Sequence, residues 1–265
     1  MRTKNRIRRI LGGLAALTVL MPGAAFAQDT AQQREDVLVP LSRHKPIYAV
    51  YGEPTPKAQI SFKFEIYPYT ELFFAYTETA FWLLREESVP FYDIKFEPEL
   101  FYRHDLPTWW LDFVRLGLFS HSSNGEDGAD SRSYDEGYLE LVTELDPGGV
   151  NFHWSNKFFT YYGLGENNLD IRSYRSVYET TMSFHVGLFP GDQLRWRGFL
   201  RREDFGPGRK DHYHVGGVQV GYMFPSLLGV DFAPQFYVQY YNGYMESWKA
   251  YDQREEIVRA GIRLK

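Results

Sequence analysis

Three residues that together could carry out acyl transfer lie in one short stretch, residues 119–138: His121, Ser123 and Asp135. In an extended strand, residues i and i+2 point to the same side, so His121 and Ser123 would lie side by side. A hairpin through the Gly- and Asp-rich loop that follows would return Asp135 beside them. A base, a nucleophile and an orienting acid are the parts of a serine hydrolase. The alternative is a polar loop that closes a hairpin, with Asn124-Gly125 as an ordinary turn pair.

The first residues of the chain predict export. Five basic residues precede an apolar run from Leu11 to Met21, and Ala25-Phe26-Ala27 follows. This pattern is typical of a secretory signal peptide, which we place at residues 1–27, with a polar leader at 28–43 and one domain at 44–265. Without the signal peptide the chain carries 24 basic and 34 acidic residues. That balance does not indicate a nucleic-acid partner.

The composition narrows the fold class. The chain has no cysteine, so disulfides do not hold it, and 18% of its residues are aromatic, including 20 Tyr and 21 Phe. After the leader no segment has 18 uninterrupted apolar residues, which excludes membrane-spanning helices. An exported chain of this kind is typical of an outer-membrane β-barrel, whose alternating strands escape hydropathy scans.

Several segments alternate between apolar and polar residues with a period of two, as half-buried strands do. They are Gln59 to Tyr67, Tyr92 to Leu100, Val230 to Tyr240 and Val258 to Lys265. Their polar faces carry long charged side chains in mid-strand, which would suit the polar lumen of a small barrel. Turn signals between the segments give twelve strands, so the predicted fold is all-β, a twelve-stranded antiparallel transmembrane barrel. The tryptophans are expected in an interfacial belt: Trp109, Trp110, Trp154, Trp196 and Trp248.

The direction of the candidate catalytic residues follows from parity. Odd-numbered residues of one strand face one side and even-numbered residues the other, which is called parity here. Asp135 shares its parity with Leu139 and Leu141, which indicates that it faces lipid. An unpaired carboxylate there would be costly, and His121 is an available partner. The parity of His121 also includes Phe119 but, against the pattern, Arg115. We expect His121 and Ser123 to point outward.

At this point the sequence resembles a known family, the outer-membrane phospholipases A. That family carries His-x-Ser-Asn-Gly and then, across a short loop, Ser-Arg-Ser-aromatic-Asn. The matching residues are His121 to Gly125 and Ser131 to Asp135, and further similar segments cover nearly the whole mature chain. The resemblance implies that Ser123 is the nucleophile and His121 its general base, with Asp135 where the family has asparagine. Either side chain can accept a hydrogen bond from the imidazole.

The resemblance also implies a calcium cofactor and a homodimer. It places the Ser131 hydroxyl and the Glu126 backbone carbonyl on the ion, and the oxyanion hole at the Gly125 N–H and a calcium-bound water. In the family, dimerisation of two barrels gates activity, and a buried glutamine on the dimer face corresponds to Glu78.

These patterns predict a calcium-dependent phospholipase of the bacterial outer membrane that hydrolyses acyl ester bonds of phospholipids at the outer rim of the barrel. The main alternative is a small porin or structural barrel in which residues 119–138 form an inert loop. A soluble exported β-sandwich is the third possibility.

Overall fold

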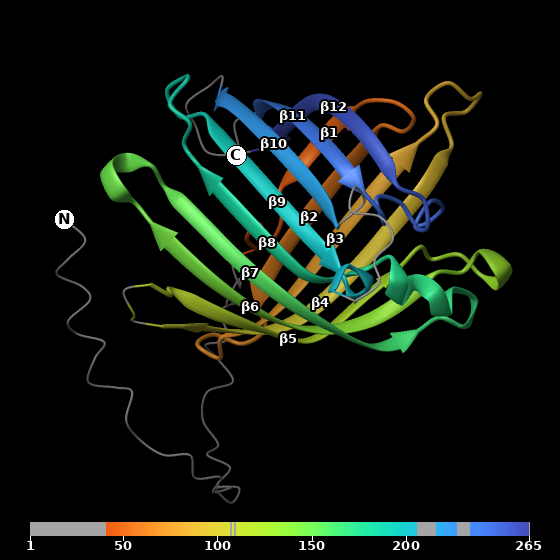
Figure 1. Ribbon diagram of the computed structural model, residues 1–265, viewed down its shortest axis with the longest axis horizontal. Helices are drawn as coiled ribbons and strands as arrows, with labels where there is room; N and C mark the ends of the chain where they lie inside the picture. The colour runs from red at the N-terminus through yellow and green to blue at the C-terminus, as the bar shows by residue number, and fades with distance from the viewer. Residues whose placement is uncertain (1–40, 107, 109, 206–215, 227–233, 265) are drawn as a thin grey trace, which may run out of the picture. The chain divides into compact units, whose positions relative to one another are not determined.

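The computed structural model describes residues 41–106, 108, 110–205, 216–226 and 234–264. Twelve antiparallel strands form a closed barrel (Figure 1). They are β1 (Ile47–Tyr51), β2 (Lys57–Glu65), β3 (Leu72–Trp82), β4 (Phe91–Asp105), β5 (Phe113–Ser123), β6 (Ser133–Leu145), β7 (Phe152–Leu164), β8 (Ser176–Phe184), β9 (Gln193–Arg201), β10 (Gly217–Ser226), β11 (Pro234–Gly243) and β12 (Glu255–Leu264). The predicted fold class and strand number are confirmed.

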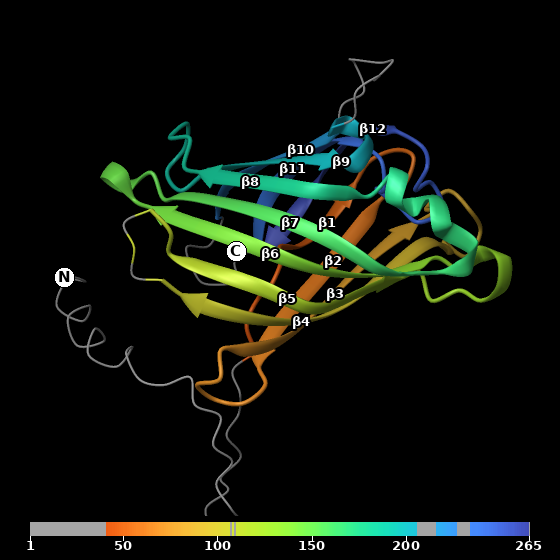
Figure 2. The ribbon, with the colours of Figure 1, turned by 60° about the horizontal axis from the view of Figure 1, so that its bottom comes forward.

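Each strand pairs with its neighbour in sequence (Figure 2). β1 closes the barrel against β12, with Ile47 opposite Leu264. Closure pairs the backbone groups along both edges of the sheet, which a structure in lipid requires. In the part of the chain that the structure describes, four short 3₁₀ segments lie in the connections: η2 (Gly128–Asp130), η3 (Pro147–Gly149), η4 (Glu166–Ser173) and η5 (Arg202–Phe205). In the described residues no helix has the length and apolar character needed to cross a membrane.

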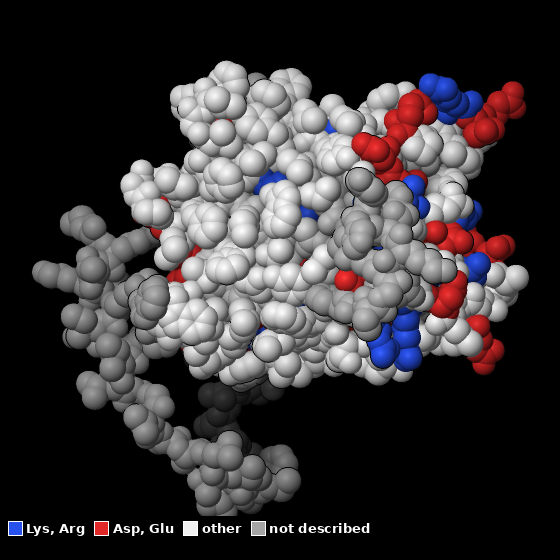
Figure 3. All heavy atoms as spheres, viewed as in Figure 1, with Lys and Arg blue, Asp and Glu red and all other residues white. Residues whose placement is uncertain are grey.

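The outer face of the barrel wall is apolar. Figure 3 shows a wall of mostly uncharged side chains, with Lys, Arg, Asp and Glu gathered near the end that holds the β3–β4 and β5–β6 connections. Large hydrophobic side chains are exposed on strands all around the barrel, among them Ile60, Leu116, Leu139, Phe158, Phe236, Val258 and Ile262. This is the surface that a barrel presents to lipid.

The lumen holds the charged side chains of the alternating strands, and most of them are paired. Short ion pairs cross it: Arg115 with Glu140 at 3.0 Å, Arg197 with Glu179 at 2.7 Å, His44 with Glu99 at 3.0 Å, and Glu246 with Lys57 at 2.6 Å and Arg259 at 2.5 Å. Pairing offsets the large desolvation penalty of these buried charges. The lumen that the alternation predicts is therefore a packed network of charges.

A β-bulge in β5 explains the mixed parity of this strand. Gly117 lies opposite Tyr138 and Ser120 opposite Glu136, so two residues of β5 face one residue of β6. On one side of the bulge the odd positions are buried, as in Phe113, and on the other the even positions are buried, as in Ser120 and Ser122. One inserted residue thus sends Arg115 inward and His121 outward.

The N-terminal segment is described only from residue 41, so the predicted signal peptide and most of the leader lie outside the described residues. Ser42 and Lys63 exchange backbone hydrogen bonds of 2.9 and 2.7 Å, and Arg43 donates to the Leu264 carbonyl. The last residues of the leader therefore continue the pairing of the barrel wall.

The predicted position of Trp248 is wrong. Its side chain is 1% exposed and packs with Tyr134 and Ile171 instead of lying in an interfacial belt. The β11–β12 connection folds inward, and its backbone N–H at Trp248 donates to the Asp93 carboxylate. Periodicity could not predict this, because the connection has no regular period. Trp154, which is 38% exposed on β7, fits the belt.

Glu246, in the β11–β12 connection, fixes that connection to the wall through Lys57 and Arg259. Burial opposes its ionisation, but the two cations outweigh this and lower the pKa of Glu246 to about 2. Because the folded-state pKa is depressed, this stabilisation is present above the unfolded pKa of about 4.3 and is lost as pH falls toward 2.

We expect Glu246→Gln to destabilise the barrel, because two buried cations lose their counter-charge. Removing one partner of a buried pair typically costs about 3–5 kcal/mol. Urea unfolding of the refolded chain followed by tryptophan fluorescence measures the effect. Glu53→Gln is the control: it breaks an exposed pair with Arg85 and should change stability by under about 1 kcal/mol. Equal midpoints for the two variants would contradict the prediction.

Candidate functional site

The end of β5 places His121 and Ser123 on the outer side of the barrel. Ser120 and Ser122 are each at most 6% exposed and face inward, whereas His121 and Ser123 are half-buried. The β5–β6 connection lies at the end of the barrel opposite to the one where β1 begins. The predicted outward direction of these two residues agrees with this burial pattern.

His121 and Asp135 lie directly opposite each other in the β5–β6 pairing. Their side chains make a hydrogen bond of 2.7 Å between the imidazole Nδ1 and a carboxylate oxygen. The side chains are 34% and 32% exposed, so neither is buried in the wall. The Nδ1 atom carries the proton in this contact, because an ionised carboxylate can only accept. The other ring nitrogen, Nε2, is then the basic one.

The type of strand pairing favours this approach. Ser133 lies two residues before Asp135 on β6. Its N–H and C=O both make hydrogen bonds on the β7 side of that strand. Ser133 and its partner Ser123 therefore form a non-hydrogen-bonded pair, and by alternation so do Asp135 and His121. Side chains come closest in pairs of this kind.

Gly163 of β7 leaves room for the Asp135 carboxylate. The two residues are opposite in the β6–β7 pairing, and a Cβ built on Gly163 would lie 2.2 Å from an Asp135 carboxylate oxygen. A bulge sits beside them at Tyr162, whose hydroxyl donates to the Glu136 carbonyl at 3.2 Å. Gly163 thus permits Asp135 to lie against the wall and meet His121.

Ser123 is the last residue of β5 and shares the outer face with His121. It lies in register with Phe96 of β4 on one side and Ser133 of β6 on the other. Among the described residues its hydroxyl is not hydrogen-bonded to the imidazole. A nucleophile and its base are often further apart without substrate than in the reacting complex, so the shared face is the relevant observation.

The loop after Ser123 is organised by Asn124. Its side-chain amide donates to the Asp130 carbonyl at 2.8 Å, and its oxygen accepts from the N–H groups of Arg132 at 2.9 Å and Glu126 at 3.3 Å. Gly125 has φ of +70°, and a Cβ there would lie 2.8 Å from the Phe96 ring. Both observations require glycine. Within the described chain the Gly125 N–H makes no hydrogen bond.

The loop offers oxygen donors of the kind that calcium prefers. The Ser131 hydroxyl and the Glu126 carbonyl are both on it, and Asp127 and Asp130 are exposed there. The Glu126 carboxylate lies 3.5 Å from the Lys249 ammonium group. The described residues contain no cluster of three or more His, Asp or Glu suited to a metal. The oxygen donors on this loop are nevertheless of the kind that suits calcium.

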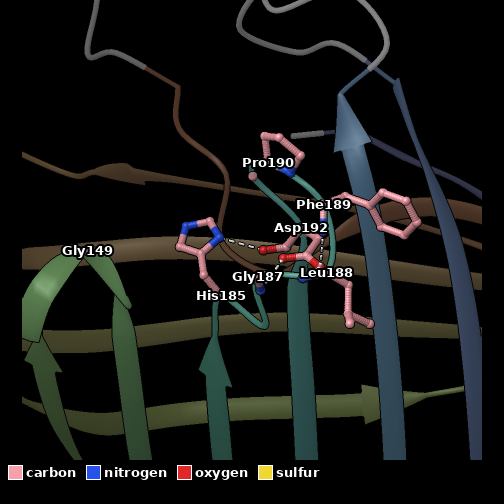
Figure 4. Close-up of a pocket in the computed structure, with 8 residues that line it drawn as sticks. Gly149, His185, Gly187, Leu188, Phe189, Pro190 and Asp192 are labelled. Carbon is pink, nitrogen blue, oxygen red and sulfur yellow. Dashed lines mark hydrogen bonds between the residues drawn. The ribbon is translucent and has the colours of Figure 1, made fainter.

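A pocket of about 420 Å³ lies at the opposite end of the barrel, on the β8–β9 turn and next to Gly149 (Figure 4). Its Asp192 carboxylate accepts hydrogen bonds from the backbone of Gly187, Leu188 and Phe189 at 2.9 to 3.1 Å. The Tyr222 hydroxyl donates to it as well. This acid is fully used in holding the turn, so we assign it no chemistry.

Two residues that support the site have no obvious sequence signal. Gly163 and Asn168 fall in a stretch that looks like an ordinary turn, yet Gly163 faces Asp135 and Asn168 bonds to Ser133. A glycine opposite a predicted catalytic acid becomes informative only once the strand register is known.

The chain is similar to known proteins in sequence and in structure. The model of the family Phospholipase A1 matches residues 38–264. The proteins named Phospholipase A1 in Salmonella typhimurium and Escherichia coli K12 are each 29% identical over 226 residues, 78% of this chain and 68% of theirs. Outer membrane phospholipase A from Escherichia coli has a similar structure, with a TM-score of 0.72 at 24% identity over 88% of this chain and 95% of that one.

A second solved structure, the Salmonella typhi outer membrane phospholipase dimer with bound calcium, also gives a TM-score of 0.72, at 24% identity. The match covers 87% of this chain and 94% of that one. At this level of identity the two solved structures establish a shared barrel fold.

We expect Gly163→Ala to reduce phospholipid hydrolysis about 10- to 100-fold, because the added methyl group displaces the Asp135 carboxylate from His121. Initial rates on mixed micelles measure the effect. A double-mutant cycle is the control: in an Asp135→Ala background, adding Gly163→Ala should lower the rate little further. Losses that simply multiply would show that Gly163 acts independently of Asp135.

Proposed function

The chain belongs to the phospholipase A1 family, and we propose that it hydrolyses acyl ester bonds of phospholipids with Ser123 as nucleophile, His121 as general base and Asp135 as the orienting acid. It is an outer-membrane phospholipase, in keeping with its family and its closed barrel. The family match and the ion pairs that cross the lumen speak against a small porin.

The observation that carries the assignment of roles is the 2.7 Å hydrogen bond between His121 and Asp135 on the outer face, with Ser123 two residues away on the same face. A paired histidine and carboxylate next to an apolar wall need a reason to be there, because polar groups facing lipid are unfavourable. A barrel with a purely structural role could have apolar side chains at these positions. The pair, the serine and their common direction together favour catalysis.

In the proposed reaction the Nε2 atom of His121 removes the hydroxyl proton of Ser123 as its oxygen attacks the ester carbonyl. Asp135 accepts a hydrogen bond from Nδ1–H, which fixes the tautomer and stabilises the imidazolium. The imidazolium then gives the proton to the leaving alcohol, and an acyl group remains on Ser123. Water, activated by the same imidazole, releases the fatty acid and restores the serine.

The negative charge that develops on the carbonyl oxygen needs a donor, and we assign this role to the Gly125 N–H. Gly125 directly follows Asn124, whose bonds across the loop hold the local backbone in place. A preorganised backbone donor of this kind typically contributes about 10²- to 10³-fold to the rate.

We also propose that the loop holds calcium, with Ser131 and the Glu126 carbonyl as ligands. The support is the oxygen donor set and the related dimer from Salmonella typhi that was solved with bound calcium. When bound, the ion would supply positive charge close to the oxyanion. Further ligands would come from water or a second chain.

The outward direction of the site suits a membrane substrate. The ester bond of a phospholipid lies at the boundary between acyl chains and head group, and the site lies on the apolar side of the wall near one rim. A lipid can therefore reach Ser123 by moving sideways in the membrane without entering the packed lumen.

Glu78 is the residue we propose to face a second barrel in a homodimer. It points outward from β3, lies opposite Ile60 and Phe96, and accepts a hydrogen bond of 2.9 Å from Tyr76. Phe96 in turn lies opposite Ser123, so Glu78 and the nucleophile are two strands apart on the same face. A carboxylate here opposes burial against an apolar partner unless it is protonated or paired.

The central test is phospholipid hydrolysis by the refolded mature chain, with calcium and with a chelator. We expect activity that depends on calcium and a loss of at least about 10³-fold in Ser123→Ala, because removal of a catalytic serine in a protease costs about 10⁶-fold in kcat. Heat-modifiable mobility in gels should show that Ser123→Ala still folds. Labelling of the wild type, but not the variant, by a fluorophosphonate identifies the nucleophile. Hydrolysis retained by Ser123→Ala would sink the assignment.

We expect Glu78→Gln to raise the dimer fraction in detergent, because a neutral amide is easier to bury than a carboxylate. Sedimentation velocity in calcium measures it. Glu256→Gln is the matched control, since Glu256 also points outward and accepts from a tyrosine, Tyr240, but lies on β12. The dimer interface would have to be sought elsewhere on the wall if Glu78→Gln stays at the wild-type fraction.

A further inference from the structure

Asn168 is a buried polar residue that the reaction does not use. It lies in η4, which follows the end of β7, and it is 1% exposed. Its side chain is packed tightly, because a Cβ built on Gly165 would lie 2.4 Å from the Asn168 side-chain oxygen. A buried amide of this kind is normally retained only where its donors and acceptor are satisfied.

Both ends of the Asn168 amide bond to the backbone of one residue, Ser133. The Asn168 nitrogen donates to the Ser133 carbonyl at 2.9 Å, and the Ser133 N–H donates to the Asn168 oxygen at 3.3 Å. The Gly165 N–H donates to the same carbonyl at 3.0 Å. The last paired residues of β6 and β7 are Tyr134 and Leu164. The Gly165 N–H continues the pairing at the Ser133 carbonyl, and the Asn168 oxygen takes the place of the next β7 carbonyl as acceptor for the Ser133 N–H.

Ser133 is where three parts of the proposed site meet. It lies opposite Ser123 in the β5–β6 pairing, and it is two residues from both Ser131 and Asp135. Its pairing with Ser123 is non-hydrogen-bonded, so the backbone of Ser133 is held from the β7 side. Loss of that hold would free the end of β6 next to the nucleophile.

The segment that carries Asn168 is itself anchored. Ile171 of η4 is fully buried and packs with Tyr134 and Trp248. Asn167, which is exposed, donates to the Gly128 carbonyl of the catalytic loop at 2.6 Å. The segment that carries Asn168 is therefore anchored by the buried Ile171, whereas the Asn167 bond lies at the surface.

We propose that Asn168 is a positioning residue for the esterase reaction: its amide extends the β6–β7 pairing beyond Leu164 and fixes Ser133, so that Ser131 and Asp135 keep their places relative to Ser123. This inference rests on the proposed function. Its physical basis is that displacement of a reacting group by about 1 Å can lower a rate by about 100-fold.

The test compares Asn168→Asp, Asn168→Ala and Asn167→Ala in the refolded full mature chain. Asn168→Asp keeps the acceptor for the Ser133 N–H but replaces the donor with an oxygen that repels the Ser133 carbonyl. We expect both Asn168 variants to lower kcat about 10- to 100-fold with KM changed less than about twofold. Labelling of Ser123 by a fluorophosphonate should slow by a similar factor. Asn167→Ala, which removes one exposed bond to the same loop, should stay within about twofold of the wild type.

A folded Asn168→Ala or Asn168→Asp with wild-type kcat overturns the inference, and so does an equal loss in Asn167→Ala. If Asn168→Ala fails to fold, the nearly isosteric Asn168→Asp decides. A wild-type chain without hydrolysis overturns the proposed function instead, whereas an active wild type with unaffected Asn168 variants overturns only the role of Asn168.

Discussion

The active face depends on one inserted residue in β5. Without the bulge between Gly117 and Ser120, a strand that sends Arg115 into the lumen would also send His121 there. The shift separates two environments on one strand, a paired cation inside and a paired imidazole outside. A chain that must keep charges away from lipid, and yet place a base against lipid, needs such a change of parity. A second bulge, at Tyr162 in β7, lies next to Gly163, the residue opposite Asp135.

The surroundings of the site come from three hairpins that are far apart in the chain. The β5–β6 loop supplies the proposed nucleophile and the oxyanion donor, and the β7–β8 connection holds Ser133 through Asn168. The β11–β12 connection brings Trp248 beneath them and Lys249 beside Glu126. Each hairpin forms locally in an up-and-down barrel, but their mutual packing forms only when the barrel is closed. The geometry of the site is thus a product of the closed barrel.

Much of this was accessible from sequence, because alternation reports directly on which side of a strand faces lipid. It predicts a charged lumen, and the turn signals between the alternating segments predict twelve strands. Asp135 alternates in step with Leu139, which indicates an outward acid available to His121. Alternation alone does not explain why Arg115 shares its parity with the outward His121, because it assumes a strand without a bulge. Trp248 was assigned wrongly for a related reason: an irregular connection that folds inward has no period to reveal it. Gly163 and Asn168 act across strand neighbours, and that register is visible only in three dimensions.

The choice of aspartate at position 135 has a physical consequence for the wall around it. A carboxylate beside lipid requires a permanent partner more strongly than an amide does, since an unpaired charge is far more costly there than an unpaired dipole. His121 satisfies this in its neutral form by donating from Nδ1, and more strongly as an imidazolium. The same carboxylate would stabilise the imidazolium that forms as Ser123 attacks. Gly163, by leaving the carboxylate space to lie flat against the strand, lets that stabilisation act at the 2.7 Å distance where it is greatest.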